Sequence, residues 1–280
     1  MRYQKTVRFF PVLASLALTL GVCPLARAQN GQLTVKVDQP GVKISPMLYG
    51  LMTEEINHSY DGGLYGELIQ NRAFKDDPNR PAHWALVQDG GASGSIGLDG
   101  AQPLNTAQPV SLKMDISSEA ANGRVGAAND GYWGIPVKPN TRYHASFYAR
   151  ASAGFRGSIT ASIESADGST TLARASVPHL TEEWKKYSVT LTTGKVAAST
   201  TNRFVLSANT PGSVWLSLVS LFPPTYHNRP NGNRVDLMKK MGDMKPAFLR
   251  LPGGNYLEGN TIAERFECPR QPGATHRQRT

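Results

Sequence analysis

Arg250 and Asn255 stand on either side of a sharp turn that follows a short apolar run. The run, Ala247 to Leu249, has the continuous apolar character of a strand that is buried on both faces, as in parallel sheets. Pro252-Gly253-Gly254 then turns the chain, which places Asn255 just past the carboxyl end of the strand. Barrels and open α/β sheets bind ligands at that end. The pattern therefore indicates a ligand-binding edge, although an ordinary helix–strand unit whose glycines only make the turn would show it too.

Two adjacent carboxylates, Glu54 and Glu55, lie in a second predicted extended segment that begins at Tyr49. Taken alone, they read as one solvated acid and one structural ion pair. Two further elements are predicted on either side of these polar groups. Val235–Met241 spaces its apolar residues as an amphipathic helix leading into the apolar run does. Leu33–Asp38 alternates apolar and polar residues, which predicts a half-buried strand.

The region from Trp84 to Phe222 has a different sequence pattern. Short segments of alternating apolar and polar residues are separated by turn pairs such as Asp167-Gly168 and Pro211-Gly212. Many short strands at this spacing predict a β-sandwich, with a jelly roll as the specific form. The expected strands are Val110–Met114, Tyr143–Ala149, Ser158–Ile163, Lys186–Leu191, Arg203–Leu206 and Ser213–Leu218.

Two separated blocks of sequence resemble glycoside hydrolase family 51 α-L-arabinofuranosidases, in the family's order. The first contains Ile44–Gly50, Glu54–Asn57, Gly62–Tyr65 and Gln70–Phe74, and the second contains Arg250–Tyr256 and Glu258–Asn260. The resemblance covers roughly residues 33–80 and 228–266. It implies the first elements of a (β/α)8 barrel, in which Gly62–Arg72 is a glycine-led loop entering a short helix at the barrel mouth. The predicted fold is thus mostly β: a jelly-roll sandwich and the start of a truncated barrel.

The resemblance also implies roles for individual residues. Glu54 and Asn255 would hold the hydroxyls of an arabinofuranose, and Arg250 would brace the site. The implied mechanism is retaining hydrolysis without metal or organic cofactor. Retaining glycosidases need two carboxyl groups about 5–5.5 Å apart, and in the family these are glutamates at the ends of the fourth and seventh barrel strands.

The chain is expected to lack both of those glutamates. A complete barrel takes about 250 residues, whereas only about 50 follow the predicted sandwich. The match also fails beyond Phe266, because Glu267–Thr280 contains no large apolar residue. This ending indicates a truncated or frame-shifted reading frame; a genuine short protein with a disordered basic tail is the alternative. The chain alone is therefore predicted to be inactive.

Trp133 and Tyr132, which lie between glycines, are the candidate residues for stacking on a sugar ring. The surrounding sequence, Gly131–Ile135 leading into Lys138–Tyr143, resembles carbohydrate-binding modules of family 4/9 type. Three other tryptophans are predicted to be core residues: Trp84, Trp184 and Trp215. Since aromatic residues in a sandwich are more often core than platform, a rigid spacer that binds no sugar is the alternative for this module.

The net charge of +9 comes largely from the two ends of the chain. Of the 30 basic residues, seven lie in the first 28 residues or the last 14, which leaves 23 against 21 acidic residues. The body is nearly neutral and has no basic stripe interleaved with aromatic residues, which argues against a nucleic-acid partner.

The N-terminus has the features of a secretory signal peptide. Arg2, Lys5 and Arg8 precede an apolar segment, Val12–Val22, that is too short to span a bilayer. Ala26-Arg27-Ala28 offers a cleavage site before Gln29, and this is favoured over a lipoprotein site at Cys23 because Val22 is bulky. A secreted or periplasmic protein without a membrane anchor is predicted. Cleavage leaves Cys268 as the sole cysteine, so no internal disulfide and no cysteine metal site is expected.

The sequence therefore predicts part of a secreted α-L-arabinofuranosidase that acts on arabinose-containing polysaccharides or oligosaccharides. A non-catalytic carbohydrate-binding protein and a non-functional gene remnant are the alternatives. The predicted segments are residues 1–28 (signal peptide), 29–80 (N-terminal part of the catalytic domain), 81–224 (sandwich), 225–266 (start of the barrel) and 267–280 (aberrant tail).

Overall fold

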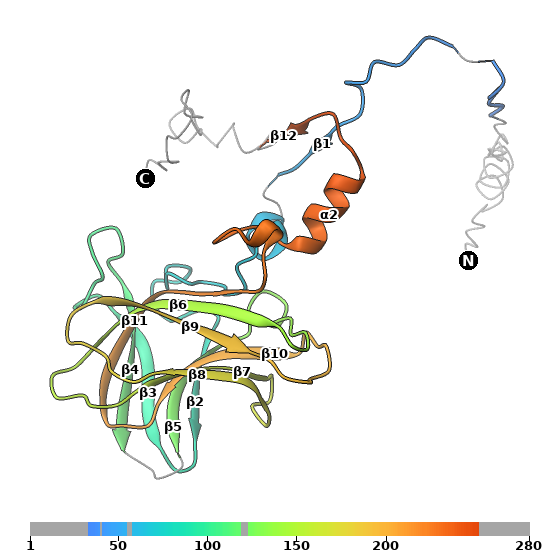
Figure 1. Ribbon diagram of the computed structural model, residues 1–280. Helices are drawn as coiled ribbons and strands as arrows, with labels where there is room; N and C mark the ends of the chain where they lie inside the picture. Colours follow the sequence, from blue (N-terminus) through green and yellow to red (C-terminus); the bar gives the residue numbers. More distant parts are fainter. Residues whose placement is uncertain (1–32, 40, 55–57, 119–122, 252–280) are drawn as a thin grey trace, which may run out of the picture. The chain divides into compact units, whose positions relative to one another are not determined.

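The computed structural model describes residues 33–39, 41–54, 58–118 and 123–251 (Figure 1). The chain divides into two compact units, residues 1–45 and 46–280. The described residues of the first unit form turns and are exposed, so the strand predicted at Leu33–Asp38 is wrong. Val35 and Val37 are 69% and 90% exposed, because no described strand pairs with this segment to bury its apolar side. Alternation alone does not make a strand.

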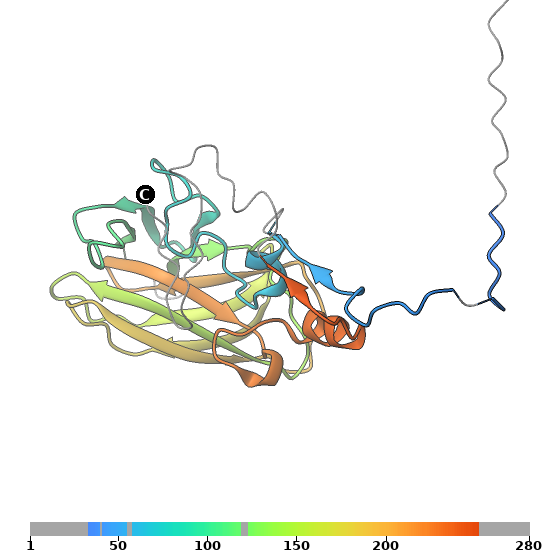
Figure 2. The ribbon, with the colours of Figure 1, turned by 90° about the horizontal axis from the view of Figure 1, so that it is seen from above.

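Two five-stranded antiparallel sheets form the sandwich in the second unit (Figures 1 and 2). The first sheet has the order β2 (Trp84–Asp89), β5 (Arg124–Asn129), β10 (Asn202–Ala208), β7 (Ile159–Ser165) and β8 (Thr171–Val177). The second has the order β3 (Ser93–Asp99), β4 (Ser111–Ser118), β11 (Gly212–Phe222), β6 (Arg142–Ala151) and β9 (Lys185–Thr192). The order β4-β11-β6-β9 over β5-β10-β7-β8 is that of a jelly roll, which confirms the predicted fold.

The core lies between the sheets and follows from the alternation within each strand. Along β6, Tyr143, Ala145, Phe147 and Ala149 are all buried, whereas the residues between them face outward. They pack in one cluster with large side chains of their own sheet, Leu112, Met114 and Leu216, and of the facing sheet, Phe204 and Leu206. Along β6 the small alanines alternate with the rings of Tyr143 and Phe147, and all four side chains are at most 1% exposed.

The three tryptophans predicted as core residues differ in burial. Trp84 is 7% exposed, and its Nε1 donates to the carbonyl of Asn71 at 3.1 Å, so the prediction is confirmed there. Trp215 is only half-buried because it alternates with the core residues Val214 and Leu216 and therefore faces outward. Trp184 is half-buried in the turn before β9. The core prediction is wrong for these two residues.

A short parallel pair and one helix complete the second unit. β1 (Leu51–Met52) pairs in parallel with β12 (Leu249–Arg250), and α2 (Val235–Asp243) precedes β12 at the predicted place. The parallel pairing confirms the direction of the strand predicted at residues 247–249. The apolar run suits a strand that is buried on both faces, but a barrel start with one strand leaves it uncovered, and the structure shows it exposed. Phe248 and Leu249 are 43% and 44% exposed, since only one short strand pairs with β12 among the described residues.

The segment Gly62–Arg72 does not form the predicted loop and helix. A single turn, η1 (Tyr60–Leu64), contains Gly62, and the chain is then extended through Ile69. The backbone N–H of Leu68 donates to the carbonyl of Leu221 at 3.0 Å, so this segment bonds to the end of β11 instead of to itself. A second short turn, η2 (Tyr226–Asn228), follows β11. No helix in the described part of the chain has the length and apolar character needed to cross a bilayer.

Candidate carbohydrate-binding site

The loop between β5 and β6 holds Trp133 toward solvent. Gly131 and Gly134 have φ values of +69° and +85°, which other residues rarely adopt. A Cβ on Gly134 would lie 1.8 Å from the carbonyl oxygen of Thr200, so the close approach of the two loops also requires glycine. The result is a fixed loop in which the Trp133 side chain is 65% exposed. An exposed, rigidly held indole is what stacking on a sugar ring needs, as the sequence predicted for this residue.

Tyr132, the second candidate for stacking on a sugar, is more buried than Trp133. It is half-buried, and Gly62 approaches its ring so closely that a Cβ there would lie 2.4 Å from the ring. The His58 ring lies 5.1 Å from the Tyr132 ring and 5.9 Å from the Trp133 ring. Tyr132 therefore positions Trp133, and the tryptophan offers the more accessible surface.

A cavity of about 470 Å³ adjoins the two aromatic residues. This volume is in the range of small-ligand sites. Its polar lining includes Lys138, Arg234 and Asp236. Arg234 donates to both carboxylate oxygens of Asp236, at 3.1 and 2.6 Å, and these bonds lower the pKa of Asp236. The cavity thus combines an aromatic wall with fixed donors and acceptors, which is the combination that carbohydrate hydroxyls and C–H faces need.

Glu67 lies in the wall of the same cavity, and its role is structural. Its carboxylate is 2% exposed and accepts from Ser220 Oγ at 2.5 Å and from the Leu221 N–H at 2.8 Å. It also accepts from the Leu68 and Ile69 N–H groups, both at 3.1 Å. Burial raises the pKa of Glu67 despite these bonds. This glutamate fastens the extended segment to β11, and sequence analysis missed it because nothing local marks a residue whose partners are far along the chain.

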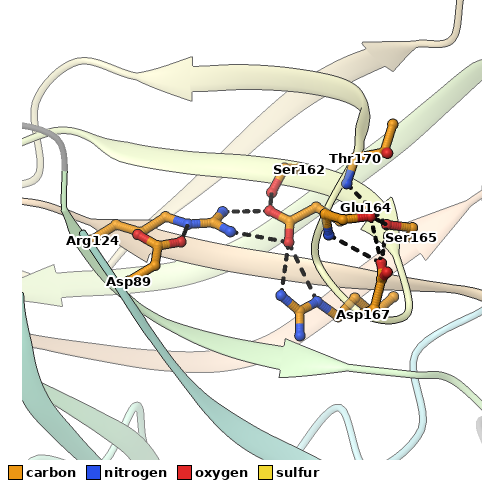
Figure 3. Close-up of polar contacts among 9 residues, drawn as sticks. Asp89, Arg124, Ser162, Glu164, Ser165, Asp167 and Thr170 are labelled. Atoms are coloured by element: carbon orange, nitrogen blue, oxygen red, sulfur yellow. Dashed lines mark hydrogen bonds and ion pairs between the residues drawn. The ribbon is translucent and has the colours of Figure 1, made fainter. Parts of the chain in front are cut away.

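A second polar group lies on the outer face of the first sheet (Figure 3). Glu164 is fully buried; its carboxylate accepts from both Nη atoms of Arg124, from Arg203 Nη2 at 3.0 Å and from Ser162 Oγ at 2.7 Å. Burial by itself would raise the pKa of Glu164, but the hydrogen bonds from Arg124, Ser162 and Arg203 outweigh it and the pKa is lowered.

The hollow over this network has a volume of about 500 Å³. Arg124 and Asp89 line it together with serine and threonine side chains, and no described lining residue is aromatic. The hollow therefore offers hydrogen bonds without a stacking surface. The sequence did not point to this network, because its members come from three separate strands.

The parallel pairing of β1 and β12 brings Glu54 and Arg250 to the same end of a strand pair. Met52 lies opposite Arg250, and the Thr53 N–H donates to the Arg250 carbonyl at 3.1 Å. Glu54 follows directly and is half-buried, whereas the side chain of Arg250 is exposed, with Nη1 3.4 Å from Met52 Sδ. Asn255 and Glu55 lie outside the described residues. Within the described ranges, no group of three or more histidine, cysteine or acidic side chains could hold a metal ion.

Comparison with known proteins identifies the sandwich. Residues 66–214 match the family model described as a carbohydrate binding domain. The chain belongs to this family of carbohydrate-binding domains. The match runs from the extended segment at Gly66 into β11, and so it includes the Trp133 loop, Glu67 and the Glu164 network of this carbohydrate-binding domain.

The chain is also similar to proteins named as α-L-arabinofuranosidases. It is 35% identical over 268 residues to alpha-L-arabinofuranosidase A of Aspergillus kawachii, which covers 93% of this chain and 41% of that protein. Alpha-L-arabinofuranosidase 1 of Arabidopsis thaliana is 32% identical over 84% of this chain and 35% of its own length. An arabinose-bound family 51 α-L-arabinofuranosidase of known structure superposes with a TM-score of 0.70 and 36% identity, over 82% of this chain and 38% of that one.

These similarities confirm the resemblance to family 51 α-L-arabinofuranosidases and support the assignment of β1, α2 and β12 as elements of a barrel fragment. The chain spans about two fifths of the length of the curated relatives it matches.

Proposed function

We propose that this chain is the carbohydrate-binding part of an α-L-arabinofuranosidase that acts on arabinose-containing polysaccharides or oligosaccharides. The observation that carries the proposal is the parallel pairing of β1 with β12, which brings Glu54 and Arg250 together from opposite ends of the sequence. In this proposal Glu54 and Asn255 hold arabinofuranose hydroxyls and Arg250 braces them. The relatives named as arabinofuranosidases support the choice of sugar.

The chain by itself is proposed to bind its carbohydrate without hydrolysing it. A retaining glycosidase needs a nucleophilic carboxylate and a second carboxyl group that donates a proton. Glu67 and Glu164 are both buried, and their oxygens accept hydrogen bonds from main-chain or arginine donors, so neither is available to a substrate. Glu54 is assigned to substrate binding. The catalytic pair would then come from a part of the enzyme beyond these elements.

The test of this proposal is a matched pair of measurements on the full chain. Calorimetric titration with an α-1,5-arabino-oligosaccharide measures binding, and release of p-nitrophenol from its α-L-arabinofuranoside measures hydrolysis. We expect binding without turnover. Trp133→Ala should weaken binding about tenfold, the loss expected for one stacking ring, whereas Leu86→Ala, an exposed apolar residue on β2, should not change it. Turnover by the chain at an enzyme-like rate would overturn the proposal.

A second candidate function is a carbohydrate-binding protein that never joins a catalytic domain. The exposed Trp133 beside its own cavity favours it, because the Trp133 loop lies within residues 66–214 and no residue of β1 or β12 lines the cavity, although Arg234 and Asp236 do. The variant Glu54→Ala distinguishes the two candidate functions. It should weaken arabinose binding only if the β1–β12 strand pair contributes to the binding site.

Export is a further part of the proposal. The leader at residues 1–28 supports cleavage after Ala28 and a secreted or periplasmic location, without nucleic-acid or membrane partners. N-terminal sequencing of protein made in a bacterial host should begin at Gln29; a retained Met1 or a lipid on Cys23 would contradict it.

A further inference from the structure

A cavity of about 690 Å³ lies on the outer face of the second sheet. It shares only Pro223 and Pro224 with the lining of the cavity beside Trp133. Its floor is built from facing positions of three strands. Phe222 on β11 pairs with His144 on β6, which pairs with Thr190 on β9. The neighbouring row is Ser220, Ser146 and Ser188. Because side chains two residues apart share a face of a sheet, these six line one surface.

The segment after β11 closes the other side of this cavity. Pro223 and Pro224 lead into η2, and the turn is held by Thr225 Oγ1, which donates to the Arg229 carbonyl at 2.6 Å. Asn228 and Arg229 also line the cavity, and both are exposed. Phe222 and the two prolines give it an apolar side, opposite a row of hydroxyl groups.

The charge of the lining distinguishes this cavity from the two others compared. The cavity beside Trp133 has Glu67 and Asp236 in its wall, and the hollow over the first sheet has Asp89. This one is lined by Arg142, Arg229 and His144, and by no carboxylate among the described residues. An anionic group entering it would meet positively charged side chains in the lining; the Glu67 carboxylate is not part of the lining but accepts a hydrogen bond from the lining residue Ser220.

The two arginines are also without a carboxylate partner. Within the described ranges, Arg72, Arg80, Arg124, Arg203 and Arg234 each form an ion pair with an aspartate or glutamate. Neither Arg142 nor Arg229 has such a pair among the described residues, and their guanidinium groups carry free donors in a planar fork. A carboxylate matches that fork with two parallel hydrogen bonds, which a neutral hydroxyl cannot do.

We propose that this cavity binds an acidic sugar, a hexuronic acid unit of a polysaccharide, through Arg142 and Arg229. The carboxylate of the sugar lies between the two guanidinium groups. The hydroxyl groups of Ser146, Ser188 and Thr190 and the side chain of Asn228 accept from and donate to the ring hydroxyls, whereas the Ser220 hydroxyl is buried and donates to Glu67. Phe222, Pro223 and Pro224 contact the C–H face. The proposal rests on the carbohydrate-binding character of the domain but not on the Trp133 site or on arabinofuranosidase activity.

The experiment is calorimetric titration of the full chain with a trimer of α-1,4-linked galacturonic acid, and with the fully methyl-esterified trimer as the matched neutral ligand. We expect the acidic trimer to bind at least about tenfold more tightly than its ester, since the ester keeps the shape and loses the charge. Arg142→Gln and Arg229→Gln should each weaken the acidic trimer about tenfold. Arg142→Lys, which keeps the charge and loses the fork, should weaken it less.

Arg156→Gln is the control variant, because Arg156 is an exposed arginine outside the cavity. It should bind like the unmodified chain. Trp133→Ala should leave the acidic trimer unaffected, while Arg142→Gln should leave arabino-oligosaccharide binding unaffected, so that failure at one site is distinguishable from failure at the other. Equal binding of the two trimers, no binding of either, unchanged binding in both Arg→Gln variants, or displacement of the trimer by an equal concentration of inorganic phosphate would each overturn the proposal.

Discussion

The sandwich and the β1–α2–β12 region differ in how far they bury their apolar side chains. In the sandwich, two sheets face each other and residues such as Phe204 and Leu216 are fully buried. In the other region, Phe248, Leu249 and Leu251 are 43–58% exposed, although their sequence has the apolar character of a buried parallel strand. Parallel strands are buried when sheets and helices cover both faces. The sandwich therefore provides its own partners, whereas the strand pair needs partners from elsewhere.

This difference in burial affects how firmly each of the two regions can hold a bound sugar. The sandwich itself holds the Trp133 loop, because the loop is anchored on β10 through the Ile135 N–H, which donates to the Asn202 carbonyl at 2.9 Å. Arg234 and the first residues of α2 add to the lining of the cavity. The pair of β1 and β12 can only position Glu54 and Arg250 to the accuracy of two short exposed strands. Binding through the sandwich should thus be stronger in this chain than binding through the strand pair.

The largest expected effect separates the two regions by stability. Phe204→Ala should lower the free energy of unfolding by about 3–5 kcal/mol, because it leaves a cavity in the fully buried core. Phe248→Ala should change it by no more than about 0.5 kcal/mol, since that side chain is already 43% exposed. Urea unfolding followed by tryptophan fluorescence measures both. Similar losses in the two variants would show that the strand pair is part of the same cooperative unit.

A smaller loss is expected from Glu164→Gln, which leaves Arg124 and Arg203 without their shared carboxylate. We expect the free energy of unfolding at pH 7 to fall by roughly 2–3 kcal/mol. This is less than the loss of about 3–5 kcal/mol when a fully buried ion pair is broken, because the two arginine side chains are 24% and 20% exposed. Thermal unfolding of the variant beside Thr171→Ala, a substitution of an exposed residue at the start of β8, measures it. An unchanged unfolding temperature in Glu164→Gln would show that the ion pairs of Glu164 do not stabilise the fold.

The two buried glutamates should impose opposite pH dependences. The pKa of Glu164 is lowered, so its contribution is complete above the ordinary value of 4.5 and is lost as the pH falls through the lower folded pKa. The pKa of Glu67 is raised, so its contribution is complete below 4.5 and is lost as the pH rises through the higher folded pKa. Unfolding free energies measured from pH 3 to pH 8 test this. Glu164→Gln should reduce the change in unfolding free energy with pH below pH 4.5, and Glu67→Gln should reduce the change above pH 4.5. The opposite result for the two variants would contradict the prediction.

The sequence predicted those parts of the fold whose signals are local. β6 alternates between buried and more exposed residues, β11 is rich in apolar residues, and α2 has its apolar stripe, so all three were expected. β5 was missed because Arg124–Asn129 contains glycine, two alanines and asparagine, residues that are depleted in strands. Its place between β2 and β10 is fixed by pairing with strands far along the chain. The same reason hid Glu67 and Glu164, whose partners are distant, and it misplaced Trp215, whose apolar neighbours concealed that it alternates outward.

A still smaller and more local effect is expected from Gly134→Ala. The φ of +85° and the contact with the Thr200 carbonyl both oppose a Cβ, which should cost about 1–3 kcal/mol and displace Trp133. Arabino-oligosaccharide binding should fall as far as in Trp133→Ala, while the sandwich stays folded by circular dichroism. Gly154→Ala is the matched control, because Gly154 also has a positive φ, +79°, but has open space around it. Equal effects of both substitutions on binding would mean that the loop does not set the position of Trp133.

Native-state hydrogen exchange of the full chain tests most directly the claim that the sandwich is self-sufficient and the strand pair is not. The amides of β10 and β11 lie in central strands, with a partner on each side, and should exchange only through global unfolding. The amides of Leu51 and Thr53, which bond to Phe248 and Arg250 at 3.0 and 3.1 Å, should exchange through local opening that costs far less free energy. Equal protection of the two sets would contradict the account, because the strand pair would then be as stable as the carbohydrate-binding domain.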